Sequence, residues 1–267
     1  MAKVKIEIYR LLEKIREQKP VVHHLTNWVT IYDCANVVKV LGASPVMAHA
    51  PEEVAEMAGI ASSLVLNIGT LTVDFINAMI IAARSANKKN IPVVLDVCGA
   101  GATTLRDTKC FELLDAAKIT IIKGNASEIA RISGESVKTK GVDAGDVTVN
   151  LADLAVRTAQ NRHCTVVITG KEDIVADEKR CYRVKNGHPM MANVVGTGCM
   201  STSVIGTFAA VDSDYVHTSA AGLVCFEIAA ELAVQKSQGP GTFKEQLFDS
   251  LFSLNKAAID TMQKVES

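Results

Sequence analysis

A short glycine-rich segment around residue 196 has the composition of an anion-binding turn. Gly196, Thr197 and Gly198 precede Cys199 and a run of small residues that predicts a helix. Glycines let a ligand approach the backbone, and a helix start offers unpaired N–H groups and a positive dipole end. A thiol in the first helical turn has a lowered pKa, so Cys199 is suited to take a proton from an attacking hydroxyl. The alternative is a plain glycine turn beside a buried cysteine.

Two acidic residues lie where predicted strands end. Asp96 ends the strand expected at Val93–Asp96, and Glu128 lies three residues after Asn125, which is expected to cap a helix. Strand ends of a parallel sheet share one edge, and phosphate-bound Mg²⁺ takes one or two carboxylates together with water. We therefore expect Asp96 and Glu128 to serve a Mg²⁺ ion. Taken locally, the spacing of Asn125 and Glu128 is more typical of ordinary helix capping.

Other strand ends carry groups that suit a phosphate. The glycine-rich loop 99–103 follows Asp96, and Thr169 ends the strand expected at 166–169. The loop N–H groups and the Thr169 hydroxyl are possible phosphate donors, although a single threonine at a strand end is more often structural. The sequence has no Gly-x-x-x-x-Gly-Lys-Ser/Thr, which excludes a P-loop.

The first third of the chain supplies a further polar cluster. Residues 23–27 read His-His-Leu-Thr-Asn, and residues 44–49 read Ser-Pro-Val-Met-Ala-His. Each histidine considered alone is more often structural, and Met47 alone is more often a core residue. Together at the same sheet edge they predict an acceptor pocket with apolar and polar walls.

The elements that must position these residues alternate along the chain. Short apolar runs between longer amphipathic segments predict a parallel sheet covered by helices on both faces. The expected strands are 21–24, 64–68, Val93–Asp96, 119–123 and 166–169. The expected helices include a first one with Val4, Ile8, Leu11, Leu12 and Ile15 that ends before Pro20, one starting at Pro51, and 73–87 and 149–160.

The remainder of the chain departs from this alternation. Residues 173–176 and 181–185 predict an antiparallel hairpin, and after residue 199 only helices are expected, at 199–211, 213–236 and 242–264. We find no linker, repeat or low-complexity segment. Residues 1–267 are therefore expected to form a single α/β domain, a three-layer α/β/α unit with a mostly parallel central sheet.

Composition narrows the class of protein. The 28 Lys and Arg residues nearly balance the 29 Asp and Glu residues, which argues against a nucleic-acid partner. No apolar run is long enough for a membrane span, and the charged N-terminus has no signal core. The seven cysteines include no Cys-x-x-Cys pair, so a zinc site is not expected. We expect a cytoplasmic protein whose partners are small molecules.

The residues quoted above resemble a known family. Asn125-x-x-Glu128 is similar to the magnesium motif of ribokinase-like kinases, and the 196–199 segment resembles their Gly-x-Gly-Asp anion hole. A cysteine in place of that aspartate is characteristic of hydroxyethylthiazole kinases. Segments 26–27, 43–50, 67–71 and 99–103 also resemble that family, in order and over nearly the whole chain.

The resemblance implies a ribokinase-like fold and the phosphorylation of 5-(2-hydroxyethyl)-4-methylthiazole with ATP and Mg²⁺, a step of thiamine salvage. It also implies a homotrimer with active sites between subunits. By matching position, the resemblance implies that Met47, Gly196 and Asn27 contact the thiazole alcohol and that Lys123, Thr169 and Asn125 contact ATP. It also implies that Asp96 and Glu128 serve the Mg²⁺ ion and that Cys199 is the catalytic group.

The chain departs from the family pattern in two places. His24 stands where the family often has asparagine, and this departure affects the details of the acceptor pocket. Val97 and Cys98 replace Pro-Val, and this departure affects the shape of the phosphate loop.

The alternative function is that of another ribokinase-like kinase, which acts on a hydroxymethylpyrimidine or pyridoxal alcohol. A Rossmann-type oxidoreductase would need its glycine motif directly after the first strand, whereas here the first strand leads into residues 23–27. A non-catalytic binding protein is a third class, and the presence of Asp96, Glu128 and Cys199 argues against it.

Overall fold

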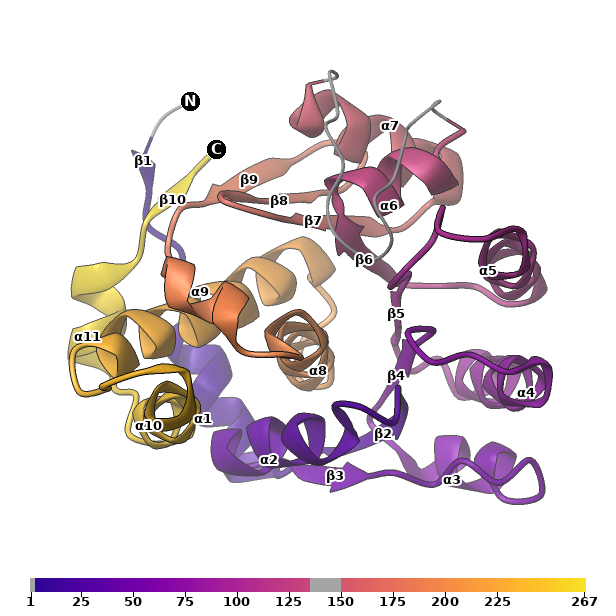
Figure 1. Ribbon diagram of the computed structural model, residues 1–267, viewed down its shortest axis with the longest axis horizontal. Helices are drawn as coiled ribbons and strands as arrows, with labels where there is room; N and C mark the ends of the chain where they lie inside the picture. The colour runs from indigo at the N-terminus through magenta and orange to yellow at the C-terminus, as the bar shows by residue number, and fades with distance from the viewer. Residues whose placement is uncertain (1–2, 135–149) are drawn as a thin grey trace.

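A computed structural model describes residues 3–134 and 150–267, which form a ten-stranded sheet with helices on both faces (Figure 1). The strands are β1 Lys3–Val4, β2 Val21–Leu25, β3 Ser44–Val46, β4 Ser63–Asn67, β5 Val93–Asp96, β6 Ile121–Asn125, β7 Thr165–Thr169, β8 Asp173–Ala176, β9 Cys181–Val184 and β10 Val265–Glu266. The helices are α1 Tyr9–Gln18, α2 Ile31–Leu41, α3 Val54–Ile60, α4 Val73–Lys89, α5 Thr104–Ala116, α6 Ala126–Ile132, α7 Leu151–Arg162, the short 3₁₀ helix η1 Pro189–Asn193, α8 Thr197–Ala209, α9 Tyr215–Val234, α10 Pro240–Phe252 and α11 Lys256–Met262.

The sheet is mostly parallel in its central part. Its strand order is β1-β10-β9-β8-β7-β6-β5-β4-β2-β3, and the six strands from β7 to β3 run parallel. The β8–β9 hairpin continues the sheet antiparallel, as the sequence predicted. The three-layer α/β/α fold with a mostly parallel sheet is therefore confirmed.

Each central strand contributes side chains to two separate cores. Val65 of β4 belongs to the core under α8 and α9, whereas Leu64 and Leu66 belong to the core under α4. On the α8 side the helix approaches the sheet closely, because a Cβ on Gly206 would lie 2.3 Å from Val65 Cγ2. Helices α3 to α7 cover one face, and α1, α2 and α8 to α11 cover the other (Figure 1).

The two chain ends differ from the prediction. Val4 lies in β1, where it pairs with Val265 of β10, so the first helix begins only at Tyr9. The region 242–264 is not one helix, because α10 ends at Phe252 and Asn255 caps α11 by accepting a hydrogen bond from the N–H of Ala258 at 3.0 Å. The expectation of helices alone after residue 199 was therefore wrong.

Two other helix boundaries also moved. The helix expected from Pro51 begins at Val54, after a turn that includes Pro51. The helix expected at 149–160 is α7, which Asn150 caps by accepting from the N–H of Ala152 at 3.0 Å. Residue 149 itself lies outside the described residues.

The long apolar helix α9 is a core element. Within the described residues it is the one helix long and apolar enough to cross a membrane, but 83% of its apolar window is buried inside the protein. Its apolar character therefore matches its position against the sheet.

Candidate active site

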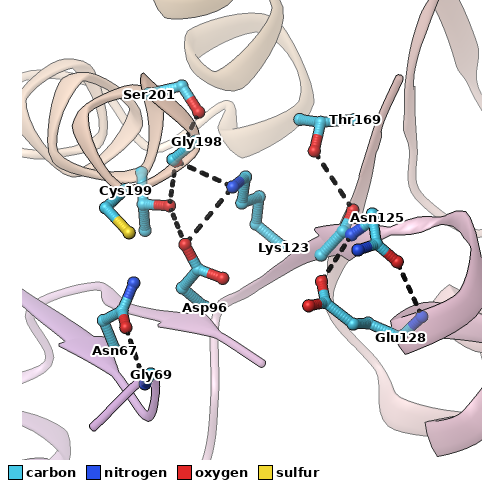
Figure 2. Close-up of polar contacts among 12 residues, drawn as sticks. Asn67, Gly69, Asp96, Lys123, Asn125, Glu128, Thr169, Gly198, Cys199 and Ser201 are labelled. Atoms are coloured by element: carbon cyan, nitrogen blue, oxygen red, sulfur yellow. Dashed lines mark hydrogen bonds and ion pairs between the residues drawn. The ribbon is translucent and has the colours of Figure 1, made fainter. Parts of the chain in front are cut away.

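The ends of the central parallel strands and the start of α8 meet at one edge of the sheet (Figure 2). Asp96 ends β5 and pairs in register with Lys123 of β6, and Asn125 at the end of β6 pairs with Thr169 at the end of β7. The first turn of α8 adds Cys199 close to Asp96 and Lys123 (Figure 2). The structure thus brings together five of the residues predicted from sequence.

The first turn of α8 is built as an anion-binding end. Gly196 precedes the helix with φ 93°, a conformation that favours glycine, and a Cβ there would lie 2.4 Å from Thr30 Cγ2. No side chain among the described residues caps this helix. The N–H groups of its first turn are therefore left for a ligand, together with the positive end of the helix dipole.

Lys123 places a fixed positive charge beneath this turn. Its Nζ donates to the carbonyl of Gly198 at 2.8 Å and lies 3.3 Å from Asp96 Oδ2, which also accepts from Thr202 Oγ1 at 2.6 Å. Burial acts to lower the pKa of Lys123, but the charges of Asp96, Cys199 and Glu128 together outweigh it, so the pKa is raised. Lys123 consequently stays protonated although it is buried.

Cys199 is poised as a thiolate. Its Sγ accepts a hydrogen bond from Asn27 Nδ2 at 3.1 Å. A hydrogen bond from the Cys98 thiol is the main reason that the pKa of Cys199 is lowered to about 6; burial and the charge of Asp96 oppose it and Lys123 supports it. These contacts favour the thiolate form of Cys199.

The amide of Asn27 is held by several partners. Besides Cys199, its Nδ2 donates to Asn67 Oδ1 at 3.1 Å, and its Oδ1 accepts from Thr30 Oγ1 at 3.0 Å. Asn67 Oδ1 also accepts from the N–H of Gly69 at 2.8 Å (Figure 2). The side chain that contacts Cys199 is thus fixed by two loops and the start of α2.

Glu128 joins two backbone turns. Its carboxylate accepts from the N–H of Gly99 at 2.7 Å and from the N–H of Asn125 at 2.7 Å, while Asn125 Oδ1 accepts from the N–H of Glu128 at 3.0 Å, which completes a capping box. Burial, and then the charge of Asp96, raise the pKa of Glu128 to about 7. The helix cap expected from the sequence is therefore confirmed, whereas the Mg²⁺ role of Glu128 stays a prediction.

This donor set suits Mg²⁺. Two repelling carboxylates, Asp96 and Glu128, lie close enough for the charge of one to raise the pKa of the other. The described part of the chain has no cluster of three or more His, Cys, Asp or Glu side chains that would hold a metal alone. Mg²⁺ prefers one or two carboxylates with water and phosphate as the other ligands.

On the acceptor side, Met47 follows β3 and is half-buried. His23 of the neighbouring β2 donates from Nε2 to the carbonyl of Ala48 at 2.7 Å and so holds this segment. Burial lowers the pKa of His23 and lowers that of His24 to about 4, so both rings are neutral. His24 is enclosed within β2, where its Nδ1 contacts the carbonyl of Val22 at 3.1 Å.

Sequence reasoning missed several residues that organise the site. Arg106 of α5 donates to the carbonyls of Ile68 at 2.9 Å, Gly69 at 2.6 Å and Cys98 at 3.1 Å, which ties together the loops after β4 and β5. No local signal marks such an arginine. Thr202, a polar residue in a mostly buried helix one turn after Gly198, was a visible signal.

Fold and site together define a ribokinase-like small-molecule kinase. A ribokinase-like superfamily protein from Enterococcus faecalis shares the fold, with a TM-score of 0.64 at 13% identity over 92% of this chain and 95% of that one. A structure of hydroxyethylthiazole kinase protein from Pyrococcus horikoshii aligns with a TM-score of 0.89 at 37% identity, over 97% of this chain and 98% of that one.

Sequence comparisons name the family. The model of the hydroxyethylthiazole kinase family matches residues 12–257. A hydroxyethylthiazole kinase of Methanosarcina mazei is 51% identical over 255 residues, which cover 96% of this chain and 98% of the relative. One from a Thermoanaerobacter species is 47% identical over 258 residues, which cover 96% and 98%. The chain belongs to the hydroxyethylthiazole kinase family, and the family predicted from sequence is confirmed.

Proposed function

We propose that this kinase transfers the γ-phosphoryl group of ATP to the hydroxyl of 5-(2-hydroxyethyl)-4-methylthiazole, in thiamine salvage. The observation that carries the proposal is the first turn of α8, where Cys199, whose pKa is lowered, lies beside N–H groups that no described side chain caps. A nucleophilic alcohol needs a proton acceptor at the point where the phosphate needs positive charge.

The chain's own groups account for the transfer step. The alcohol oxygen attacks the γ-phosphorus, the bond from that phosphorus to the leaving ADP oxygen breaks, and the alcohol proton passes to Cys199 Sγ. Phosphoryl transfer depends mainly on positioning and on charge stabilisation. Lys123 and the N–H groups after Gly196 supply that charge where the phosphate oxygens are expected.

The residues proposed to bind the metal and the nucleotide lie at the same edge of the sheet. Asp96 and Glu128 would hold Mg²⁺ through water, and the ion would neutralise phosphate charge. Asn125 and Thr169, paired at the ends of β6 and β7, would contact ATP beside Lys123. Met47, Asn27 and Gly196 would surround the thiazole alcohol.

A homotrimer with shared active sites is part of the proposal. Exposed apolar side chains surround the acceptor side, namely Trp28 (49% exposed), Val29 (68%), Tyr32 (76%) and Val195 (74%). The Trp28 ring packs edge-on against His49 with ring centroids 4.7 Å apart. A patch of this kind commonly marks a protein interface.

We also infer that the enzyme acts in the cytoplasm. All seven cysteines are free thiols. Thiols remain reduced in that compartment, and the proposed base requires it.

The test is a coupled assay of ADP formation with the thiazole alcohol, run beside hydroxymethylpyrimidine. We expect Mg²⁺-dependent turnover with the thiazole alcohol. Turnover with hydroxymethylpyrimidine but not with the thiazole alcohol would show that the pyrimidine is the acceptor substrate. ATP binding without phosphoryl transfer to either alcohol would contradict the kinase proposal.

A further inference from the structure

Two buried carboxyl groups outside the residues discussed so far meet between β8 and α9. Asp173 begins β8 and is 5% exposed, and Glu227 lies in α9 and is 6% exposed. Among the described residues no N–H or O–H donor reaches Glu227 Oε2, whereas the carboxyl of Asp173 lies within hydrogen-bonding contact of Glu227. A buried polar atom left without a partner is costly, so this contact calls for a physical account.

One shared proton accounts for the contact. Burial raises the pKa of both carboxyls, and the charge of Asp173 raises that of Glu227 further. Two carboxylates in contact in the interior cannot both be ionised. With one proton, Glu227 becomes the donor, Asp173 becomes the acceptor, and both are satisfied.

The pair is attached to the proposed nucleotide site. Asp173 Oδ1 accepts from the N–H of Gly170 at 2.9 Å, and Gly170 directly follows Thr169. One helical turn after Glu227, Glu231 Oε1 accepts from the N–H of Gly187 at 3.0 Å. The two acids of α9 and Asp173 therefore hold the turn after β7 and the segment that leads to α8.

We propose that Asp173 and Glu227 are positioning residues, which share one proton and thereby hold the Thr169–Gly170 turn in the conformation that binds the nucleotide. The inference rests on the proposed placement of ATP at Thr169. The pair is therefore expected to affect the affinity for ATP and not the rate of phosphoryl transfer.

The charged groups around the pair set its response to pH. Lys123 faces it from β6, and from α9 Glu231 faces it, with Lys264 bound to Glu231 at 2.9 Å. On β9, Arg183 is directed to Glu172 at 3.4 Å. Loss of the shared proton at high pH makes the two carboxylates repel, so the turn shifts and ATP affinity falls.

The test measures ATP binding by calorimetry together with KM and kcat, from about pH 6 to about pH 9. Glu227→Ala should weaken ATP binding about tenfold, as loss of a buried hydrogen bond predicts, with kcat and the KM for the alcohol nearly unchanged. Glu227→Gln carries a permanent donor to Asp173, so it should restore ATP affinity to near the wild-type value. Glu178→Gln, the same substitution at an exposed residue of the β8–β9 turn, is the control.

The outcomes separate this inference from the proposed function. If wild type binds ATP and phosphorylates the alcohol while Glu227→Ala binds ATP equally well, the pair is only a core contact. If Glu227→Gln binds ATP as weakly as Glu227→Ala, no shared proton is involved. A wild-type protein that does not bind ATP would overturn the kinase proposal and this inference with it.

Discussion

At the scale of single residues, the chemistry depends on how Cys199 is ionised. Asn27 and Cys98 contact its sulfur from two loops, and Lys123 adds positive charge from β6. An aspartate at this position would be ionised without such help. We therefore expect Cys199→Asp to keep or raise kcat, and Cys199→Ala to lose much of kcat but not all, since Lys123 and the helix N–H groups remain. If the kcat of Cys199→Ala equals that of wild type at every pH, Cys199 is only a packing residue.

The Cys98 thiol should determine the acidic limb of the pH profile. Wild-type kcat should fall as pH drops through about 6, where Cys199 takes up a proton. Cys98→Val removes the main hydrogen-bond donor to Cys199, so the pH midpoint of this limb should rise by about one pH unit. A hydrogen bond to a charged group contributes about 1.5–3 kcal/mol, and one pH unit corresponds to about 1.4 kcal/mol. The rate of Cys199 alkylation against pH reports the same shift. Cys164→Val, a half-buried cysteine before β7, is the control. An unchanged limb in Cys98→Val would contradict this origin of the thiolate.

At the scale of elements, Glu128 connects the cap of α6 to the loop after β5. A glutamine offers one acceptor, so either Gly99 or Asn125 would face an N–H group instead of an oxygen. Glu128→Gln should lower the free energy of unfolding by about 1–3 kcal/mol and also lower kcat at limiting Mg²⁺. Urea unfolding and a Mg²⁺ titration measure the two effects. Reduced stability with normal turnover at limiting Mg²⁺ would leave Glu128 as a helix cap only.

At the scale of the whole molecule, the exposed apolar patch makes the proposed trimer testable. Tyr32 lies at the start of α2 and is 76% exposed, so Tyr32→Glu should leave the fold of one subunit intact. A charge in a buried interface opposes association, so we expect a shift from trimer to monomer and a loss of turnover. Sedimentation measures the first and the coupled assay the second. Phe252→Glu, at an exposed site on α10, is the control. A wild-type monomer that is active at assay concentration would rule out shared sites.

Much of the fold was predictable because the central strands are buried on both faces. Their continuous apolar runs mark β2 and β4 to β7 to within two residues at each end. The pairing of β1 with β10 was not predictable, because Lys3 and Glu266 lie at opposite ends of the chain and neither two-residue strand has a period of its own. The break between α10 and α11 was missed because the apolar spacing continues across it.

The sequence by itself determined the family, the acids at the strand ends and the glycine turn before Cys199, since these depend on residue type and local spacing. Only the tertiary structure decided that Cys98 contacts Cys199, that Lys123 stays charged beside Asp96, and that Asp173 meets Glu227. Each of these contacts joins two elements far apart in the chain. Local periodicity places a side chain on one face of its own element, whereas the packing of helices on the sheet determines which side chain it meets there and how each group is charged.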